Sequence, residues 1–234
     1  MDYTLLQKQI VDTAEKYVGM TEIKGNMGWT SDSFEEKMIA TGWGETQAWC
    51  AYFTELVWSE VYDPLGLAKD LDKYFSGSAR RTLSKFAEAE GWETGTVPVA
   101  GAVAIWKLVK GGKDKWQGHA GIVTNVLDSH METVEGNTNG GGSREGDVVA
   151  KKNRKYNFKV TNGLALEGFV YPKGIKPPVP FKSKAEGDAF RYWVNTYHAD
   201  VAKRLDLDPK GSFFNSFITK AYEELKDAYA IYKN

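Results

Sequence analysis

The sequence predicts an α+β fold, in which N-terminal helices pack on an antiparallel sheet, followed by a small C-terminal helical module. Within residues 5–91, apolar residues recur at helical spacing between charged residues. Residues 99–171 instead contain short β-rich runs separated by Gly, Asn and Lys clusters. Helices that precede a set of strands are typical of an α+β domain.

Four helices are expected in the first part of the chain. The first covers residues 5–19, where the apolar positions at helical spacing are Leu6, Ile10, Ala14 and Val18. Ser31 is a candidate N-cap for a second helix, which ends at Gly42. A third helix is expected over residues 49–62, and a charged fourth helix over residues 78–91.

Four β-strands are expected in the runs 99–109, 119–127, 131–136 and 164–171. The basic run "KKNRKYNFK" at residues 151–159 has two interpretations. It is either a solvated hairpin or a surface that attracts anionic polymers.

A boundary is predicted near residue 172. Residues 173–184 read as an extended linker because prolines and lysines cluster there, namely Lys173, Lys176, Pro177, Pro178, Pro180, Lys182 and Lys184. The chain therefore divides into a main domain (1–172), a linker (173–184) and a helical hairpin module (185–234), whose helices are expected at 186–205 and 213–232.

Composition excludes several functional classes. A single cysteine excludes an intrachain disulfide and a cysteine-rich zinc site. The net charge of −1 provides no basic footprint for nucleic acid. No run of eighteen apolar residues occurs, so no membrane insertion is expected. The N-terminus lacks the apolar region of a secretion signal, so we expect the protein to be made in the cytoplasm. If it acts outside the cell, we expect another protein to release it. We also expect it to be a monomer.

Cys50 is the first candidate functional residue. A lone cysteine is commonly a buried apolar side chain. Cys50, however, lies in the first turn of an expected helix, where free N–H groups and the helix dipole favour an anion. These conditions favour a reactive thiolate, and the same N–H groups can stabilise an oxyanion. Both interpretations remain open from the residue alone.

A cysteine nucleophile needs a base, and His119 is the best-placed of three histidines. His130 lies in an expected turn and His198 in the tail. Gly118 and Gly121 flank His119 and are expected to leave room for a substrate backbone. The alternative for His119 is a half-buried strand histidine without a catalytic role.

The imidazole in turn needs a group that fixes its orientation. Glu135 ends the strand 131–136, and Asn137 follows it. Either side chain could reach the imidazole. Asn137 also has an alternative interpretation as a simple turn-forming residue.

Three ordered motifs, "WCAYF", "GHAGIV" and "VEGNTNGGGSREGDVV", resemble the CHAP domain, a family of cysteine- and histidine-dependent amidohydrolases and peptidases. The resemblance covers residues 5–172 and implies a papain-like fold of the NlpC/P60 type. It implies that Cys50 is the nucleophile, His119 the general base and then acid, Glu135 the orienting residue, and Asn137 a further active-site residue. The implied substrate is bacterial peptidoglycan, cleaved in a stem peptide, in a cross-bridge, or between muramic acid and L-alanine.

The sequence departs from the family pattern at two places. Some members bind calcium through an Asp-rich loop before the cysteine, but "ATGWGETQAWC" contains one carboxylate, Glu45. Since calcium needs six to eight oxygen ligands, we predict no calcium there, no other metal and no cofactor. Ala102 replaces an acidic residue that commonly precedes the histidine strand.

Trp49, Trp106 and Gln117 are expected to line the substrate groove, because Trp49 adjoins the nucleophile and Gln117 lies two residues before His119. Trp106 ends the preceding expected strand. Core packing is the alternative for either tryptophan.

The missing secretion signal favours a phage endolysin that accumulates in the host cytoplasm and reaches the wall after holin-type release. Two alternatives stay open: a phage virion or tail protein whose CHAP-like domain penetrates or binds the wall, and a cytoplasmic amidase acting on small peptides. The C-terminal module is expected to bind the cell wall or to anchor the protein to a particle.

Overall fold

A computed structural model describes residues 3–127, 130–139, 146–156, 159–175, 184–204 and 216–233. The chain divides into two compact units, Met1–Lys176 and Pro177–Asn234. The division falls inside the segment 173–184 that we predicted to be a linker, of which residues 176–183 lie outside the described residues.

The first unit begins with its helices, as expected. They are α1 (Tyr3–Lys16), α2 (Asp32–Ala40), α3 (Cys50–Tyr62), the short 3₁₀ helix η1 (Asp63–Leu65), α4 (Ala68–Leu71) and α5 (Ala79–Glu88). The four predicted helices correspond to α1, α2, α3 and α5. The short elements η1 and α4 were not predicted, because one turn of helix leaves no periodic pattern to detect.

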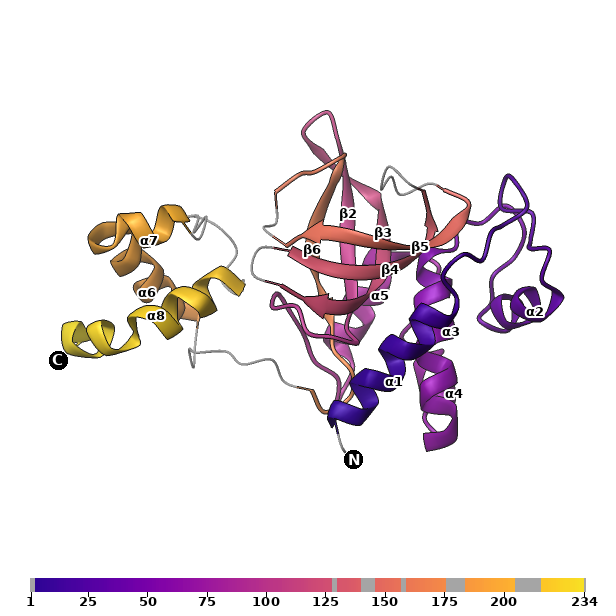
Figure 1. Ribbon diagram of the computed structural model, residues 1–234, viewed down its shortest axis with the longest axis horizontal. Coiled ribbons are helices and arrows are strands. Elements are labelled where there is room, and N and C mark those ends of the chain that lie inside the picture. Colours follow the sequence, from indigo (N-terminus) through magenta and orange to yellow (C-terminus); the bar gives the residue numbers. More distant parts are fainter. Residues whose placement is uncertain are drawn as a thin grey trace. The chain divides into compact units, whose positions relative to one another are not determined.

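A six-stranded antiparallel sheet follows, in the order β1-β6-β2-β3-β4-β5 (Figure 1). Its strands are β1 (Thr94–Gly95), β2 (Val103–Lys110), β3 (Lys113–Val126), β4 (His130–Thr138), β5 (Val148–Lys155) and β6 (Leu164–Val170). The predicted α+β class with an antiparallel sheet is confirmed, and the arrangement is consistent with a papain-like fold.

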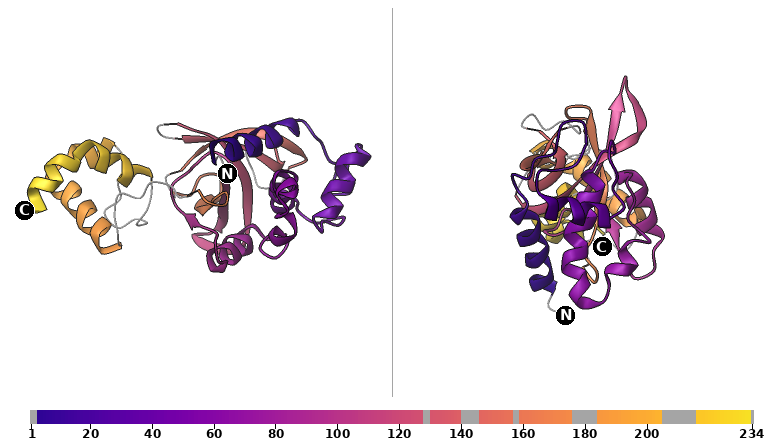
Figure 2. Two further views of the ribbon diagram at one scale, coloured as in Figure 1. Left: turned by 90° about the horizontal axis from the view of Figure 1, so that it is seen from below. Right: turned by 90° about the vertical axis from the view of Figure 1, so that its right-hand side faces the viewer.

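The helix α3 connects the two layers. It contacts β3, β4 and α1, and α1 and α3 lie next to each other (Figures 1 and 2). Its buried side chains join one apolar core with those of the sheet; the strand residues in that core are Val103, Ile105, Ala120, Ile122, Val134, Val149 and Val170. Burial of this surface supplies the main favourable free energy of the first unit.

Residues Lys151–Lys155 lie in β5, which pairs antiparallel with the preceding strand β4 at the edge of the sheet. Residues 151, 153 and 155 are exposed, in agreement with a solvated hairpin, and attraction to anionic polymers stays a prediction. Lysines are frequent on edge strands because their charge opposes pairing with another chain. Residues 157 and 158 lie outside the described residues.

The second unit contains α6 (Lys184–Tyr197), α7 (Ala199–Arg204) and α8 (Ser216–Lys233). The single helix predicted over 186–205 is therefore wrong: it is interrupted at His198, whose ring packs 4.6 Å from that of Trp193. The buried apolar side chains of α6 and α7 include Phe190, Trp193, Val194 and Val201. Their rings pack on α8, with Phe190 4.8 Å from Tyr229. The connector 205–215 lies outside the described residues.

Candidate active site

Cys50 is the first residue of α3, and its side chain is 5% exposed. The preceding Trp49 is fully buried and donates a hydrogen bond from Nε1 to Glu22. Its ring packs against Trp29 at 5.2 Å. The start of α3 is thus fixed by core packing, and the sole thiol lies at a helix N-terminus, where an anion is favoured.

His119 lies on β3 opposite Trp106 on β2, and Glu135 lies on the neighbouring strand β4. The His119 Nε2 atom is 2.8 Å from Glu135 Oε2. Both side chains are fully buried. Because Glu135 occupies Nε2, the other ring nitrogen, Nδ1, is the one left for Cys50.

A glycine makes the His119–Glu135 contact sterically possible. A Cβ atom at Gly121 would lie 2.6 Å from Cγ of Glu135, closer than carbon atoms can approach. We expected Gly118 and Gly121 to leave room for a substrate. Gly118 does line the pocket beside Cys50, but the space at Gly121 is filled by Glu135.

Arg154 on β5 completes the group and was missed in the sequence. Its Nε donates to Glu135 Oε1 at 2.7 Å and its Nη2 donates to Glu135 Oε2 at 2.5 Å. Thr133 Oγ1 donates a further hydrogen bond to Oε1 at 2.6 Å. The available signal was strand alternation: Ala150, Lys152 and Arg154 share one face of β5, and Ala150 pairs with Glu135.

These contacts shift the pKa values of the group. Burial disfavours the imidazolium, but the neighbouring Cys50 and Glu135 outweigh burial and raise the pKa of His119 to about 9. Burial would raise the pKa of Glu135, but hydrogen bonds from Arg154 and His119 hold it well below its usual range. The arrangement therefore favours a charged imidazolium between a thiolate and a carboxylate, which is the state that nucleophilic cysteine catalysis requires.

Asn137 lies near the group but contacts other partners. Its backbone is left-handed, with φ 51°, at a register shift between β4 and β5. Its Nδ2 donates to Asn26 Oδ1 at 3.1 Å and to the Gly146 carbonyl at 2.8 Å. Asn137 thus braces the loop that contains Asn26, and the structure places Glu135, not Asn137, on His119.

A pocket of about 310 Å³ opens beside Cys50. It lies between the start of α3, the start of α5 and β3, and is lined by Gln47, Ala48, Cys50, Tyr52, Gly77, Ser78, Ala79, Trp116, Gln117 and Gly118. None of these residues carries a full charge at neutral pH in its usual state. The pocket therefore suits an uncharged part of a substrate.

Of the three predicted groove residues, only Gln117 lines this pocket, and its role in binding stays a prediction. Trp49 and Trp106 are 0% and 3% exposed, so the expectation that they line the groove is wrong. Both indoles fill the interior, which was the alternative interpretation. The aromatic residues beside Cys50 are instead Tyr52 and Trp116, and Trp116 is 75% exposed. Its isolation within the charged hairpin "KGGKDKWQG" was the signal for it.

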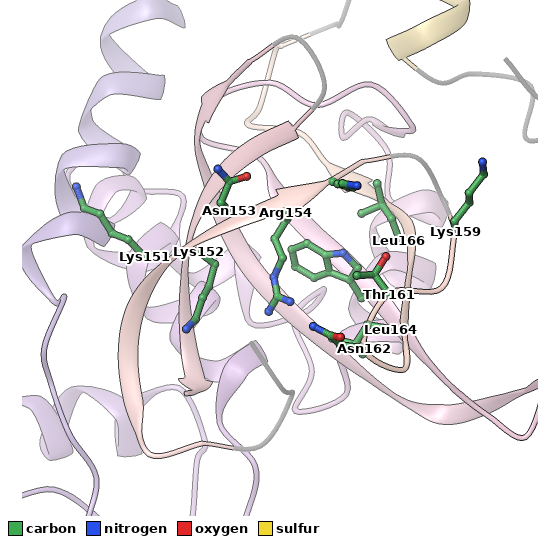
Figure 3. A pocket seen from close by; sticks show the side chains of 11 residues that line it. Lys151, Lys152, Asn153, Arg154, Lys159, Thr161, Asn162, Leu164 and Leu166 are labelled. Atoms are coloured by element: carbon green, nitrogen blue, oxygen red, sulfur yellow. The ribbon is translucent and has the colours of Figure 1, made fainter. Parts of the chain in front are cut away.

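Trp106 forms part of another cavity, of about 450 Å³, which Arg154 also lines. Figure 3 shows Lys152 and Arg154 on the same side of β5 in this cavity, with Thr161 and Asn162 across from Arg154. Lys151 points away from the cavity and pairs with Glu15 of α1 at 2.6 Å (Figure 3). The Arg154 guanidinium can therefore be approached from this cavity.

The loop before Cys50 is ordered by hydrogen bonds. Thr46 N donates to the Asn26 carbonyl at 2.7 Å, and Trp43 Nε1 donates to the Gln47 carbonyl at 2.9 Å. Within the described part of the chain, no group of three or more His, Cys, Asp or Glu side chains is arranged to hold a metal ion. The same part of the chain contains no helix with the length and apolar character needed to cross a membrane.

Comparison with known proteins identifies one family. The model of the CHAP domain matches residues 41–137. The match includes Cys50, His119, Glu135 and Asn137, and it ends before Arg154. No curated protein and no solved structure matches the chain.

Proposed function

The chain carries a CHAP domain of the peptidoglycan amidase and peptidase class, and from this we propose that it hydrolyses an amide bond of peptidoglycan with Cys50 as nucleophile. His119 acts as general base and then general acid, and Glu135 orients its ring. The observation that carries the proposal is the buried His119–Glu135 contact of 2.8 Å, with the only thiol of the chain close enough to His119 to raise the pKa of the imidazole.

The reaction proceeds by two acyl transfers. The Cys50 thiolate attacks the scissile carbonyl carbon, and a bond from Sγ to carbon forms. The backbone N–H of Cys50, at the start of α3, donates to the oxyanion. Imidazolium His119 gives its Nδ1 proton to the leaving nitrogen, and the C–N bond breaks.

The second half regenerates the enzyme. Neutral His119 takes a proton from water while the water oxygen attacks the thioester carbon. The C–S bond breaks, the carboxylic acid product leaves, and the thiolate–imidazolium pair is restored. Glu135 stays ionised throughout, because its low pKa keeps the proton on the imidazole.

The pocket beside Cys50 supports a substrate with an uncharged group next to the scissile bond. An exposed Trp116 ring with amide and hydroxyl side chains around it suits either a sugar face or an uncharged stretch of peptide. The bond is therefore either the amide between muramic acid and L-alanine or a peptide bond of the stem or cross-bridge.

We place the activity in phage-mediated lysis, with accumulation in the host cytoplasm and holin-type release. The alternative setting is a phage virion or tail protein that uses the same domain on the wall. The compact second unit favours an insoluble polymer or a particle as target over small soluble peptides. We assign this unit to wall binding or anchoring.

Purified protein and a Cys50→Ala variant added to peptidoglycan sacculi test the proposal. The wild type is expected to clear the suspension and release new amino termini, whereas Cys50→Ala does neither. The rate is expected to fall as pH rises through about 9, because the raised pKa of His119 keeps the imidazolium below that pH and loses it above. Equal activity of the two proteins would overturn the mechanism, and mass spectrometry of the fragments identifies the bond.

A further inference from the structure

We propose that Arg154 is a positioning residue of the hydrolase: its guanidinium orients Glu135 on His119 and balances the buried charge of the catalytic group. Arg154 donates two hydrogen bonds to Glu135, and we assign its effect on the catalytic group to that carboxylate. The expected effect of Arg154 on turnover rests on the proposed function. Its expected effect on the pKa of the Cys50 thiol does not.

Glu135 is held from two sides by a fixed set of donors. Oε1 accepts from Arg154 Nε at 2.7 Å and from Thr133 Oγ1 at 2.6 Å. Oε2 accepts from Arg154 Nη2 at 2.5 Å and faces His119 Nε2 at 2.8 Å. A bidentate guanidinium fixes the plane of a carboxylate, which a single ammonium cannot do. The plane of Glu135 in turn determines the direction in which the His119 ring points.

The charges of the group cancel only if Arg154 is included. In the reactive state, Cys50 and Glu135 each carry one negative charge, and His119 and Arg154 each carry one positive charge. The His119 and Glu135 side chains are 0% exposed and that of Arg154 is 12% exposed. Without Arg154 the same region would bury a net negative charge, which costs several kcal/mol in a low-dielectric interior. The thiolate and the carboxylate would both become harder to form.

Lys152 is a second cation that faces this group, from the same side of β5 (Figure 3). Burial lowers its pKa, and the Arg154 charge opposes its protonation while Glu135 favours it. Its ammonium donates to the Asn139 carbonyl instead of to Glu135. Lys152 therefore does not replace the bidentate contact that Arg154 makes.

The Trp106 ring lies beside both residues that contact Glu135, namely Arg154 and His119. Its ring lies 5.4 Å from the Arg154 guanidinium and 5.9 Å from the His119 ring. The indole limits movement of both side chains and excludes water from their face. The cavity of about 450 Å³ is lined by both Trp106 and Arg154, so a small cation can replace the guanidinium if the side chain is truncated.

The first test measures the Cys50 thiol without any substrate. The pH dependence of iodoacetamide alkylation is compared in wild type, Arg154→Met, Arg154→Lys and Thr133→Val. In Arg154→Met we expect the midpoint to move to higher pH by about one unit, because the cation that balances the thiolate is gone. Arg154→Lys keeps the charge and Thr133→Val keeps the ion pair, so both midpoints stay near that of wild type. An unchanged midpoint in Arg154→Met would overturn the charge-balancing role.

A matched control distinguishes this role from a merely structural one. Arg80 also makes a two-bond ion pair, with Glu167, through Nε at 2.7 Å and Nη2 at 2.6 Å. Neither residue contacts His119. Arg80→Met is expected to lose stability without moving the alkylation midpoint. A shift as large as that of Arg154→Met would show that the midpoint reports general loosening of the fold.

The second test measures turnover on sacculi. Arg154→Lys is expected to lower kcat roughly tenfold with little change in KM, because one ammonium cannot fix the carboxylate plane. Wild-type kcat in this variant would overturn the orienting role, and the result stands even if Arg154→Met fails to fold.

Chemical rescue gives a third readout. Guanidinium at about 20 mM, far below denaturing concentrations, is expected to restore activity to Arg154→Ala at least severalfold by entering the cavity. Urea at the same concentration should not, since it lacks the charge. Equal effects of both additives would contradict the proposal. If sacculi are not cleaved by any variant, the proposed function fails while the alkylation result still decides the role of Arg154.

Discussion

The two faces of the sheet differ in what they bury. The face toward α3 is apolar, with Ile105, Ala120, Ile122 and Val134 in one continuous core. The other face of the same strands buries His119, Glu135 and Arg154 beside Trp106. His119 and Ala120 are adjacent in β3, yet His119 contacts Glu135 whereas Ala120 packs in the apolar core.

The difference separates stability from chemistry. Burial of the apolar face is favourable in proportion to the area removed from water. Burial of the charged face is costly unless every charge has a partner. The apolar face stabilises the strands at a fixed register, and that register holds His119 and Arg154 each within 3 Å of Glu135. Variants on the two faces should therefore affect different measurable quantities.

The largest effect on both turnover and stability is expected when the charge of Glu135 is removed. Glu135→Gln leaves the Arg154 charge without its carboxylate and the imidazole without an anion. We expect kcat on sacculi to fall about 10²–10³-fold and the free energy of unfolding to fall by about 3–5 kcal/mol. Denaturant titration and turnover measure the two quantities.

The double variant Glu135→Leu/Arg154→Met sharpens this result. It removes both charges together, so it is expected to recover most of the lost stability but none of the activity. Wild-type turnover in the double variant would show that the buried charges have no catalytic purpose.

Truncation of a side chain on the apolar face should lower stability and leave turnover nearly unchanged. Ile122→Ala removes a side chain with 0% exposure, and we expect the free energy of unfolding to fall by about 2–5 kcal/mol. Turnover measured well below the unfolding temperature should stay within about twofold of wild type. A loss of turnover comparable to that of Glu135→Gln would contradict the separation of the two faces.

Two glycines allow the faces to be compared with the same substitution. A Cβ at Gly121 would lie 2.6 Å from Glu135 Cγ, whereas a Cβ at Gly136 would lie 2.5 Å from the Trp49 ring and 2.8 Å from Phe53 Cβ. Gly121→Ala should displace Glu135 and mainly lower kcat. Gly136→Ala should push apart β4 and α3 and mainly lower stability, by about 1–3 kcal/mol. If both variants change kcat and stability to the same extent, the two faces do not have separate roles.

The smallest effect concerns a carboxyl group on the helix that covers the apolar face. Glu55 of α3 is 4% exposed, and burial, reinforced by the charge of Asp72 and opposed by Lys85, raises its pKa to about 8. The folded protein therefore keeps a proton that the unfolded chain loses above pH 4.5. The stability of the wild type should fall as pH rises from about 4.5 to about 8.

Glu55→Gln removes that dependence. It should raise the free energy of unfolding on the order of 2 kcal/mol at pH 7 and leave it nearly unchanged at pH 4. Thermal unfolding at both pH values tests this, and an equal gain at both would show that ionisation is not the cause.

The sequence by itself predicted four helices and four strands of the first unit and the resemblance to the CHAP family, and it singled out a helix-start thiol at Cys50 and a strand histidine at His119. These features are local: a repeat of apolar residues, a motif, or the position of a residue within one element.

Only the tertiary structure decided which side chains meet. Arg154 joins Glu135 because β5 pairs with β4 at one particular register, and a basic run carries no sign of that register. Trp49 and Trp106 are buried because α3 and the sheet enclose them, although Trp49 precedes Cys50 in the sequence and Trp106 pairs with His119. Contacts between distant segments depend on register and packing, which the periodicity of a single segment does not specify.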